Sequence, residues 1–247
     1  MLLAPWWQSF LARPARRVAA GAFVYLKGDA APSVYLLRSG LVRTSVVWRD
    51  GREYILRLVR PGELFGETSF GAPEYGEHAR TLEASEVVEI PAVALIAQIV
   101  HNYDAAAELL KELAHRVVEA QQAVRNLAFA STMERVCLVL EKLADELGEP
   151  GDRATAIPHY IRQEDVARMT GARREVVSGL LNRLREKGVI GYSRKGSLRV
   201  DRGALDRYVQ SLLKASRVTV SKRDNLQHAR RPIASHVGNS SHLEGQP

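Results

Sequence analysis

The sequence predicts an α+β protein in which a small β-domain is followed by a long helix and then by a second, mainly helical domain. Three observations lead to this prediction. Short apolar runs separated by glycines fill residues 17–92, a texture typical of an antiparallel barrel, roll or sandwich. Residues 104–129 contain neither proline nor glycine. Residues 161–208 then combine short helical patterns with one hairpin pattern.

The β-domain is predicted from runs of β-branched and aromatic residues between turn residues. The Asp-Gly pair within Arg49–Glu53 predicts a hairpin, because this dipeptide favours the tight turns that join antiparallel strands. We assign residues 1–102 to this domain. The runs that carry the strand pattern are FVYLKGD, SVYLLRSGLVRTSVVW, REYILRLV and SEVVEI.

The long helix predicted over residues 103–130 carries a seam of apolar residues at alternating steps of four and three. A narrow heptad stripe bordered by charged and amide residues suits one partner helix. We therefore favour a parallel homodimer over packing of this helix within its own domain. The seam residues are Ala106, Leu110, Leu113, Val117, Ala120, Val124 and Leu127.

The last domain is predicted to be a helix-turn-helix with a wing. A helix is expected over Thr132–Leu147, followed by the loop GEPGDRATAIPHY at a domain boundary. Small and apolar residues in Gln163–Leu181 fit two short helices that cross steeply, with Gly171 where the turn needs a positive φ. A hairpin with RKG at its tip follows. This domain spans residues 131–215, and the polar residues 216–247 are predicted to be a disordered tail.

The start of the second helix of this motif holds the residues expected to contact DNA. Such a helix enters the major groove, where arginine can pair with guanine and glutamate with cytosine. We predict base contacts from Arg174, Glu175 and Ser178, in preference to a merely solvated face. Phosphate contacts fix register without reading sequence, and they are predicted for Arg173, Arg183, Arg194 and Lys195.

Composition agrees with a cytoplasmic protein that binds a polyanion. The formal net charge is +7, with 46% hydrophobic and 26% charged residues. No apolar stretch is long enough to cross a membrane, and the N-terminus does not read as a secretory signal. The single cysteine, Cys137, excludes an internal disulfide and an all-cysteine iron–sulfur cluster, and its apolar surroundings predict a buried thiol. We find no sequence pattern for a metal site or a catalytic nucleophile, so an enzyme is not expected.

Four segments of the sequence, over about residues 15–208, resemble motifs of the CRP/FNR superfamily of transcription regulators, the cyclic-AMP receptor protein relatives, and occur in the same order. PGELFGE resembles the start of the family's phosphate cassette, and SEVVEI resembles the strand that closes its β-roll. NLAF resembles the end of the dimerisation helix, and GARREVVSGLLNRLREKGVI resembles the recognition helix and wing. The resemblance implies a cyclic-nucleotide-binding-type β-roll as effector or sensor domain, a dimerisation helix and a winged helix-turn-helix. It also implies effector-gated DNA binding with recruitment of RNA polymerase.

The resemblance places the effector pocket at Glu67, Tyr75, Gly76 and Gln121. Glu67 matches the family's ribose-binding acid, but Tyr75 and Gly76 stand where cyclic-AMP-responsive relatives carry Arg-Ser. Gln121 and the preceding Ala120 stand where hydroxyls are expected to face the adenine. A phosphate without its arginine lacks a charge-assisted partner worth about 1.5–3 kcal/mol. We therefore expect weak or absent cyclic-AMP binding and predict no cofactor.

The recognition helix departs from the family at Gly179, which stands where the second reading arginine is expected. The operator should therefore differ from the family's usual half-site at one position. The expected function is that of a homodimeric, sequence-specific transcription regulator of near-palindromic promoter sites. Gating by an effector other than cyclic AMP and effector-independent binding both remain open. The alternative is a nonspecific or architectural DNA-binding protein with a degenerate regulatory pocket.

Overall fold

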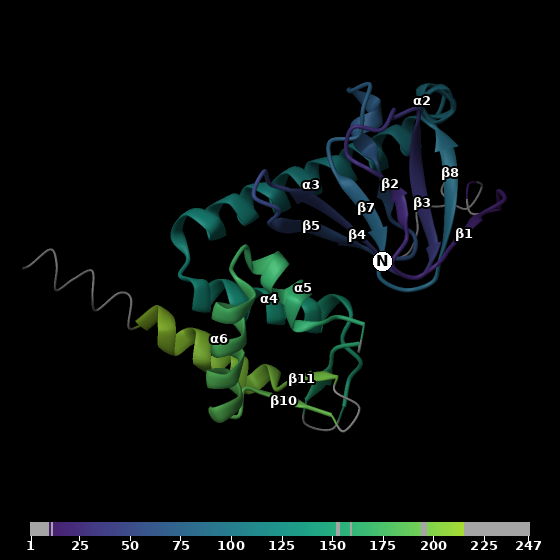
Figure 1. The fold of residues 1–247 in the computed structure, drawn as a ribbon. Helices are drawn as coiled ribbons and strands as arrows, with labels where there is room; N and C mark the ends of the chain where they lie inside the picture. Colours follow the sequence, from purple (N-terminus) through teal and green to yellow (C-terminus); the bar gives the residue numbers. More distant parts are fainter. Residues whose placement is uncertain (1–9, 11, 152–153, 159, 194–196, 215–247) are drawn as a thin grey trace, which may run out of the picture. The chain divides into compact units, whose positions relative to one another are not determined.

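The computed structural model describes residue 10 and residues 12–151, 154–158, 160–193 and 197–214 (Figure 1). The chain divides into two compact units, Met1–Asp206 and Arg207–Pro247. The strands and helices labelled below all belong to the first unit. In the second unit the described residues, 207–214, are helical. The α+β class predicted from the sequence is confirmed.

The N-terminal part is a β-roll of two four-stranded antiparallel sheets, with strand orders β1-β8-β3-β6 and β2-β7-β4-β5. Alternate residues of β3 point to opposite faces, as strand geometry requires. Tyr35 and Leu37 join a core drawn from both sheets, whereas Val34 and Leu36 pack on Leu95 and other residues outside the roll. The strands are β1 (Arg16–Val18), β2 (Phe23–Tyr25), β3 (Ser33–Ser39), β4 (Val42–Val47), β5 (Glu53–Val59), β6 (Leu64–Phe65), β7 (His78–Thr81) and β8 (Ser85–Pro91).

The hairpin predicted at the Asp-Gly pair is confirmed as the β4–β5 connection. Gly51 has φ +83°, which an L-residue adopts only with strain. The backbone N–H of Trp48 donates to the carbonyl of Arg52 at 2.8 Å, closing the turn. The antiparallel register then runs from Val47 opposite Glu53 to Val42 opposite Val59.

Two helices follow the roll. The short α2 (Ala92–Val100) buries Ala92 and Leu95, and α3 (Tyr103–Phe129) is a continuous helix of 27 residues. The Asn102 side chain caps α3 by accepting from the Ala105 N–H at 3.0 Å, which satisfies one of the free N–H groups of the first turn. Among the described residues, no helix has the length and apolar character that crossing a membrane requires.

The C-terminal part begins with α4 (Thr132–Glu146), which starts at a capping box made by Ser131 and Glu134. The predicted apolar face of α4 is confirmed, since its three residues Val136, Leu140 and Leu143 are fully buried. The remaining elements are β9 (Thr155–Ala156), α5 (Gln163–Thr170), α6 (Arg174–Glu186), β10 (Ile190–Tyr192) and β11 (Leu198–Val200), and residues 202–206 are again helical.

The segment read as a loop between α4 and α5 contains a strand that the sequence analysis missed. Thr155 and Ala156 form β9, which pairs with β11 and makes the wing a three-stranded sheet in the order β10-β11-β9. The buried Ile157 continues this pairing, donating its N–H to the Leu198 carbonyl at 2.8 Å. Two residues give no periodic pattern, so tertiary pairing alone defines this strand.

Candidate nucleic-acid interface and effector region

The reading head, defined here as residues 163–200, contains a steep turn between two short helices. Gly171 ends α5 in the left-handed region, with φ +67°, as the sequence predicts. Ala167 is 3% exposed in the contact between α5 and α6, where a small residue allows close approach. Val166 and Val177 are buried at the same contact, whereas Met169 is half-buried. This is the geometry of a helix-turn-helix.

The face of α6 opposite its packed side is charged and open. Val177, Leu181 and Leu184 are buried, so helical geometry turns Glu175 and Gly179 outward. Arg174 and Glu175, two of the predicted base-reading residues, are exposed, and Ser178 is half-buried. Within the described part of the chain, neither Arg174 nor Glu175 makes a hydrogen bond or ion pair, so both remain available to an external partner.

Two of the predicted phosphate-binding residues, Arg173 and Arg183, are also exposed on the reading head. No side chain caps the start of α6, where Arg173 is the N-cap residue, so the first N–H groups of the helix make no hydrogen bond to a capping side chain. A helix N-terminus with free N–H groups favours anions such as phosphate. The other two, Arg194 and Lys195, lie outside the described residues.

The interior of the roll is filled by stacked aromatic rings. Tyr75, predicted as an effector-pocket residue, is 2% exposed, and its ring centroid lies 3.8 Å from that of Tyr25. Tyr35 and Phe65 continue the stack, with ring centroids 5.3 Å apart. The Tyr75 hydroxyl donates to the Ser33 carbonyl at 2.6 Å. Burial raises the pKa of both Tyr25 and Tyr75, so each carries a neutral hydroxyl that is matched within the protein.

Glu67, the residue that matches the family's ribose-binding acid, is held by arginines of this chain. It lies at the start of the 3₁₀ turn Glu67–Phe70, and its Oε1 is 2.7 Å from Arg116 Nη1 of α3. Arg57 Nη2 lies 3.9 Å from the other carboxylate oxygen. Both guanidinium groups also donate to the Leu64 carbonyl, at 2.6 Å from Arg57 and 2.8 Å from Arg116. Neither arginine is among the predicted pocket residues, because both come from elements outside the cassette.

The four predicted pocket residues differ in their exposure. Gly76 and Gln121 are exposed, whereas Tyr75 is buried in the aromatic stack and Glu67 is half-buried. Arg80, the later arginine of the cassette region, points to the roll edge, where its Nε donates to the Gly21 carbonyl at 2.6 Å. Burial raises the pKa of the Cys137 thiol to about 12, which confirms the buried cysteine inferred from its apolar neighbours.

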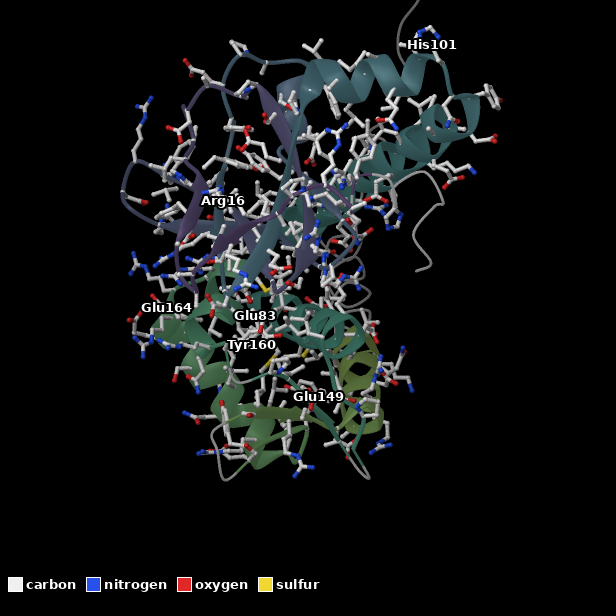
Figure 2. All side chains as sticks on the ribbon, turned by 90° about the vertical axis from the view of Figure 1, so that its right-hand side faces the viewer. Arg16, Glu83, His101, Glu149, Tyr160 and Glu164 are labelled. Atoms are coloured by element: carbon white, nitrogen blue, oxygen red, sulfur yellow. The ribbon has the colours of Figure 1, made fainter. Side chains whose placement is uncertain are left out.

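A residue of the roll also lies near the segment that leads into the reading head. Figure 2 shows Glu83, between β7 and β8, beside Tyr160, which lies just before α5. Burial and then the charges of Glu83 and Glu149 raise the pKa of the Tyr160 hydroxyl.

Comparison with known proteins identifies the family to which this fold and this reading head belong. The cyclic nucleotide-binding domain matches residues 15–102, and the Crp-like helix-turn-helix domain matches residues 134–208. The chain is 30% identical over 192 residues to a CRP-like cAMP-activated global transcriptional regulator of Mycobacterium tuberculosis, covering 76% of this chain and 84% of that protein. The chain belongs to the CRP/FNR superfamily of transcription regulators.

Two further similarities cover most of this CRP/FNR chain. Transcriptional regulator LdrP of Thermus thermophilus is 29% identical, over 81% of this chain and 100% of that protein. The crystal structure of a CRP-family transcriptional regulator from the same organism, Thermus thermophilus, superposes with a TM-score of 0.68 at 28% identity, covering 79% of this chain and 96% of that one. These relatives are transcription regulators rather than enzymes, and the helix-turn-helix makes DNA the partner of this chain.

Proposed function

We propose that this CRP/FNR regulator works as a homodimer that reads two half-sites of a near-palindromic operator. The observation that carries this proposal is the open face of α6, whose Arg174 and Glu175 have no internal partner in the described structure. Arg174 would pair with guanine, Glu175 would accept from cytosine, and Ser178 would supply a further polar contact. Arg173 and Arg183, with Arg194 and Lys195 of the wing, would hold phosphates.

An apolar stripe on α3 supports the dimer. Leu110 is 67% exposed, Val117 56% and Val124 64%, although each is a large aliphatic residue on the predicted seam. Exposed aliphatic residues at heptad spacing on a long helix are typical of a surface that another helix covers. Pairing along this stripe would give the dimer two reading heads, which would read half-sites about one helical turn, ~34 Å, apart.

For the effector we propose that cyclic AMP binds weakly or not at all. Stacked tyrosines fill the roll interior, and Glu67 is already paired with Arg116 at 2.7 Å. A ligand would have to displace these contacts without gaining an arginine at residue 75 or 76. The Mycobacterium tuberculosis relative is described as cAMP-activated, whereas the name of LdrP states no effector. Titration calorimetry tests this proposal, and micromolar affinity together with tightened operator binding would overturn it.

Selection of bound sequences from random DNA tests the regulator itself. Enrichment of a symmetric motif, together with a dimer in sedimentation at working concentration, is the expected result. Equal binding of scrambled and selected duplexes would favour the alternative, a nonspecific or architectural DNA-binding protein. A monomer would contradict the paired reading of half-sites.

We also propose that the bound dimer acts in the cytoplasm by recruiting RNA polymerase. This proposal goes beyond membership of a transcription-regulator family, because it states how the protein acts. Whether the protein activates or represses a gene follows from where the operator lies in the promoter. Transcription in vitro from a template that carries the selected motif is the direct test. Unchanged initial polymerase binding on addition of the regulator would contradict recruitment.

A further inference from the structure

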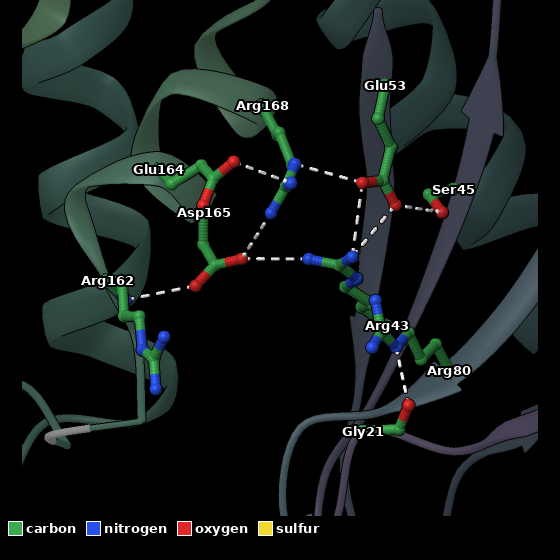
Figure 3. A network of polar contacts seen from close by, with 9 residues as sticks. All are labelled: Gly21, Arg43, Ser45, Glu53, Arg80, Arg162, Glu164, Asp165 and Arg168. Atoms are coloured by element: carbon green, nitrogen blue, oxygen red, sulfur yellow. Dashed lines mark hydrogen bonds and ion pairs between the residues drawn. The ribbon is translucent and has the colours of Figure 1, made fainter. Parts of the chain in front are cut away.

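An ion-pair network joins strands β4 and β5 of the roll to helix α5 of the reading head (Figure 3). Arg43 on β4 donates from Nη1 to Asp165 Oδ1 at 2.8 Å and from Nη2 to Glu53 Oε2 at 3.1 Å. Arg168 closes the network from α5, with its Nε 2.9 Å from Glu53 Oε2 and its Nη1 3.4 Å from Asp165 Oδ1. Two arginines and two carboxylates therefore alternate, with one of each from the roll and one of each from the head.

The centre of this network is buried. The side chains of Arg43 and Asp165 are 4% and 7% exposed. Burial lowers the pKa of Arg43, while the neighbouring carboxylates of Glu53 and Asp165 oppose that shift. Charges this deep are costly unless they are paired, so the head is held where each charge meets its partner. The planar fork of arginine reaches both carboxylates at once, which a lysine ammonium would not reproduce.

Asp165 links this network to the path of the helix-turn-helix. Its second oxygen, Oδ2, accepts from the Arg162 N–H at 3.0 Å at the start of α5, so the carboxylate that receives Arg43 also caps the helix. At the other end of α5, a Cβ on Gly171 would lie 3.1 Å from Leu127 Cδ2 of α3 and 3.5 Å from the Tyr54 ring of β5. Helix α5 is thus seated at both ends, and α6 begins three residues after the turn glycine.

We propose that Arg43 is a positioning residue for DNA recognition. Being 4% exposed, it offers no surface to DNA, and it acts through Asp165 by fixing α5 and hence the direction of α6. The proposal rests on the dimeric regulator proposed above. A head released from this position would still bind one half-site. The two heads of the dimer would, however, no longer be held in the orientation that fits both half-sites at once. The gain in affinity that comes from binding two linked half-sites would therefore fall.

The test compares two duplexes with the full-length protein. One carries the selected operator with both half-sites, and the other has one half-site scrambled. Arg43→Met should lower affinity for the intact operator about tenfold, while affinity for the single half-site stays within about twofold. Asp165→Asn should give the same pattern, because asparagine keeps a capping oxygen but loses the charge. Thermal unfolding of each variant confirms that the head is folded, and Asp165→Asn serves alone if Arg43→Met does not fold.

A matched control lies on the same hairpin. Arg52 is 70% exposed and pairs with Asp50 within the turn, so Arg52→Met should change binding to neither duplex. The double variant Arg43→Met with Asp165→Asn should lose about as much as either single variant, since the two residues act as one unit. Fully additive losses would contradict that coupling.

The outcomes separate this inference from the function on which it rests. Loss of affinity for both duplexes in equal measure would mean a damaged head rather than a misplaced one, and would overturn the positioning role. Unchanged binding to the intact operator would overturn it as well. If the wild-type protein selects no symmetric motif, the proposed regulator fails before Arg43 is tested.

Discussion

The reading face of α6 and the interior of the roll differ in how most of their polar side chains are partnered. Arg174 and Glu175 are exposed and make no hydrogen bond or ion pair within the described residues. In the roll, Glu67 is paired with Arg116, and the Tyr75 hydroxyl donates to a backbone carbonyl. Exposed charges can remain unpaired because water solvates them, whereas a buried polar group without a hydrogen-bond partner in the protein is energetically costly. Three oxygens in the roll are exceptions, since Glu67 Oε2, Thr68 Oγ1 and Ser69 Oγ are buried without a hydrogen-bond partner among the described residues. The face of α6 differs in that its unpaired groups are exposed charges, which an external ligand can reach without displacing any contact of the protein.

The largest expected effect comes from a substitution in the aromatic interior of the roll. Phe65→Ala should lower the free energy of unfolding by about 3–5 kcal/mol, because it removes a fully buried ring and leaves a cavity. Phe65 is 0% exposed, and its centroid lies 5.3 Å from that of Tyr35. Urea unfolding followed by circular dichroism measures the change. A loss of unfolding free energy below about 1 kcal/mol would show that the aromatic interior rearranges at little cost, and the interior would then be a candidate ligand site again.

On the other side of the comparison, Arg174→Ala should leave stability unchanged and weaken operator binding by about 1–3 kcal/mol, with relaxed preference at one base pair. Arg174 makes no hydrogen bond or ion pair in the described structure, so its removal leaves no polar group unmatched. Binding to a panel of single-base operator variants measures the effect. Weakening spread evenly over the panel would reassign Arg174 to phosphate.

Gly179→Ala tests why the reading face of α6 carries a glycine. The helical position is open, because apart from the neighbouring backbone of α6 no atom lies within 4 Å of an added Cβ, so alanine should stabilise the protein by about 0.5–1 kcal/mol. If the glycine serves close approach to DNA, operator affinity should fall although the fold is more stable. Calorimetric unfolding and operator titration separate the two effects. Alanine that destabilises would mean that the backbone here is not an ordinary helix.

The smallest expected effect is a pH dependence in the roll. Burial, followed by the charge of Glu67, raises the pKa of Glu77 from 4.5. The folded state therefore holds a proton that the unfolded chain releases, and stability falls as pH rises from the unfolded value to the folded one. Glu77→Gln should flatten this decline by about a few tenths of a kcal/mol. Melting temperatures at pH 4 and pH 7 provide the measurement, and an unchanged slope would rule out Glu77 as its source.

Sequence patterns predicted the elements whose signal is local. The Asp-Gly turn at Gly51, the glycine at 171 and the apolar face of α4 each follow from spacing and residue type, and the structure confirms them. The roles of Arg174, Glu175 and Ser178 stay predictions, because exposure alone does not assign a DNA contact. These local signals locate individual turns and helix faces, whereas the strand orders of the two sheets were not predicted.

Interactions between distant residues account for what the sequence did not reveal. Arg43 and Asp165 are 122 positions apart, and a single arginine within a strand gives no sign of its partner. Arg116 likewise reads as a residue flanking the helix seam, although its guanidinium lies against Glu67. The stacking that buries Tyr75 depends on how β2, β3 and β6 bring their rings together.

The pairing of β9 with β11 has a practical consequence for dissecting the molecule. A fragment that begins at Ile161 would contain both helices of the motif and the wing, yet it would lack Thr155 and Ala156, leaving one edge of β11 without its hydrogen-bonding neighbour. An uncovered strand edge invites association with other chains. Fragments meant for spectroscopy should therefore start at or before Ser131. Such a fragment includes the third strand, β9, and the buried side of α4, both of which belong to the C-terminal domain.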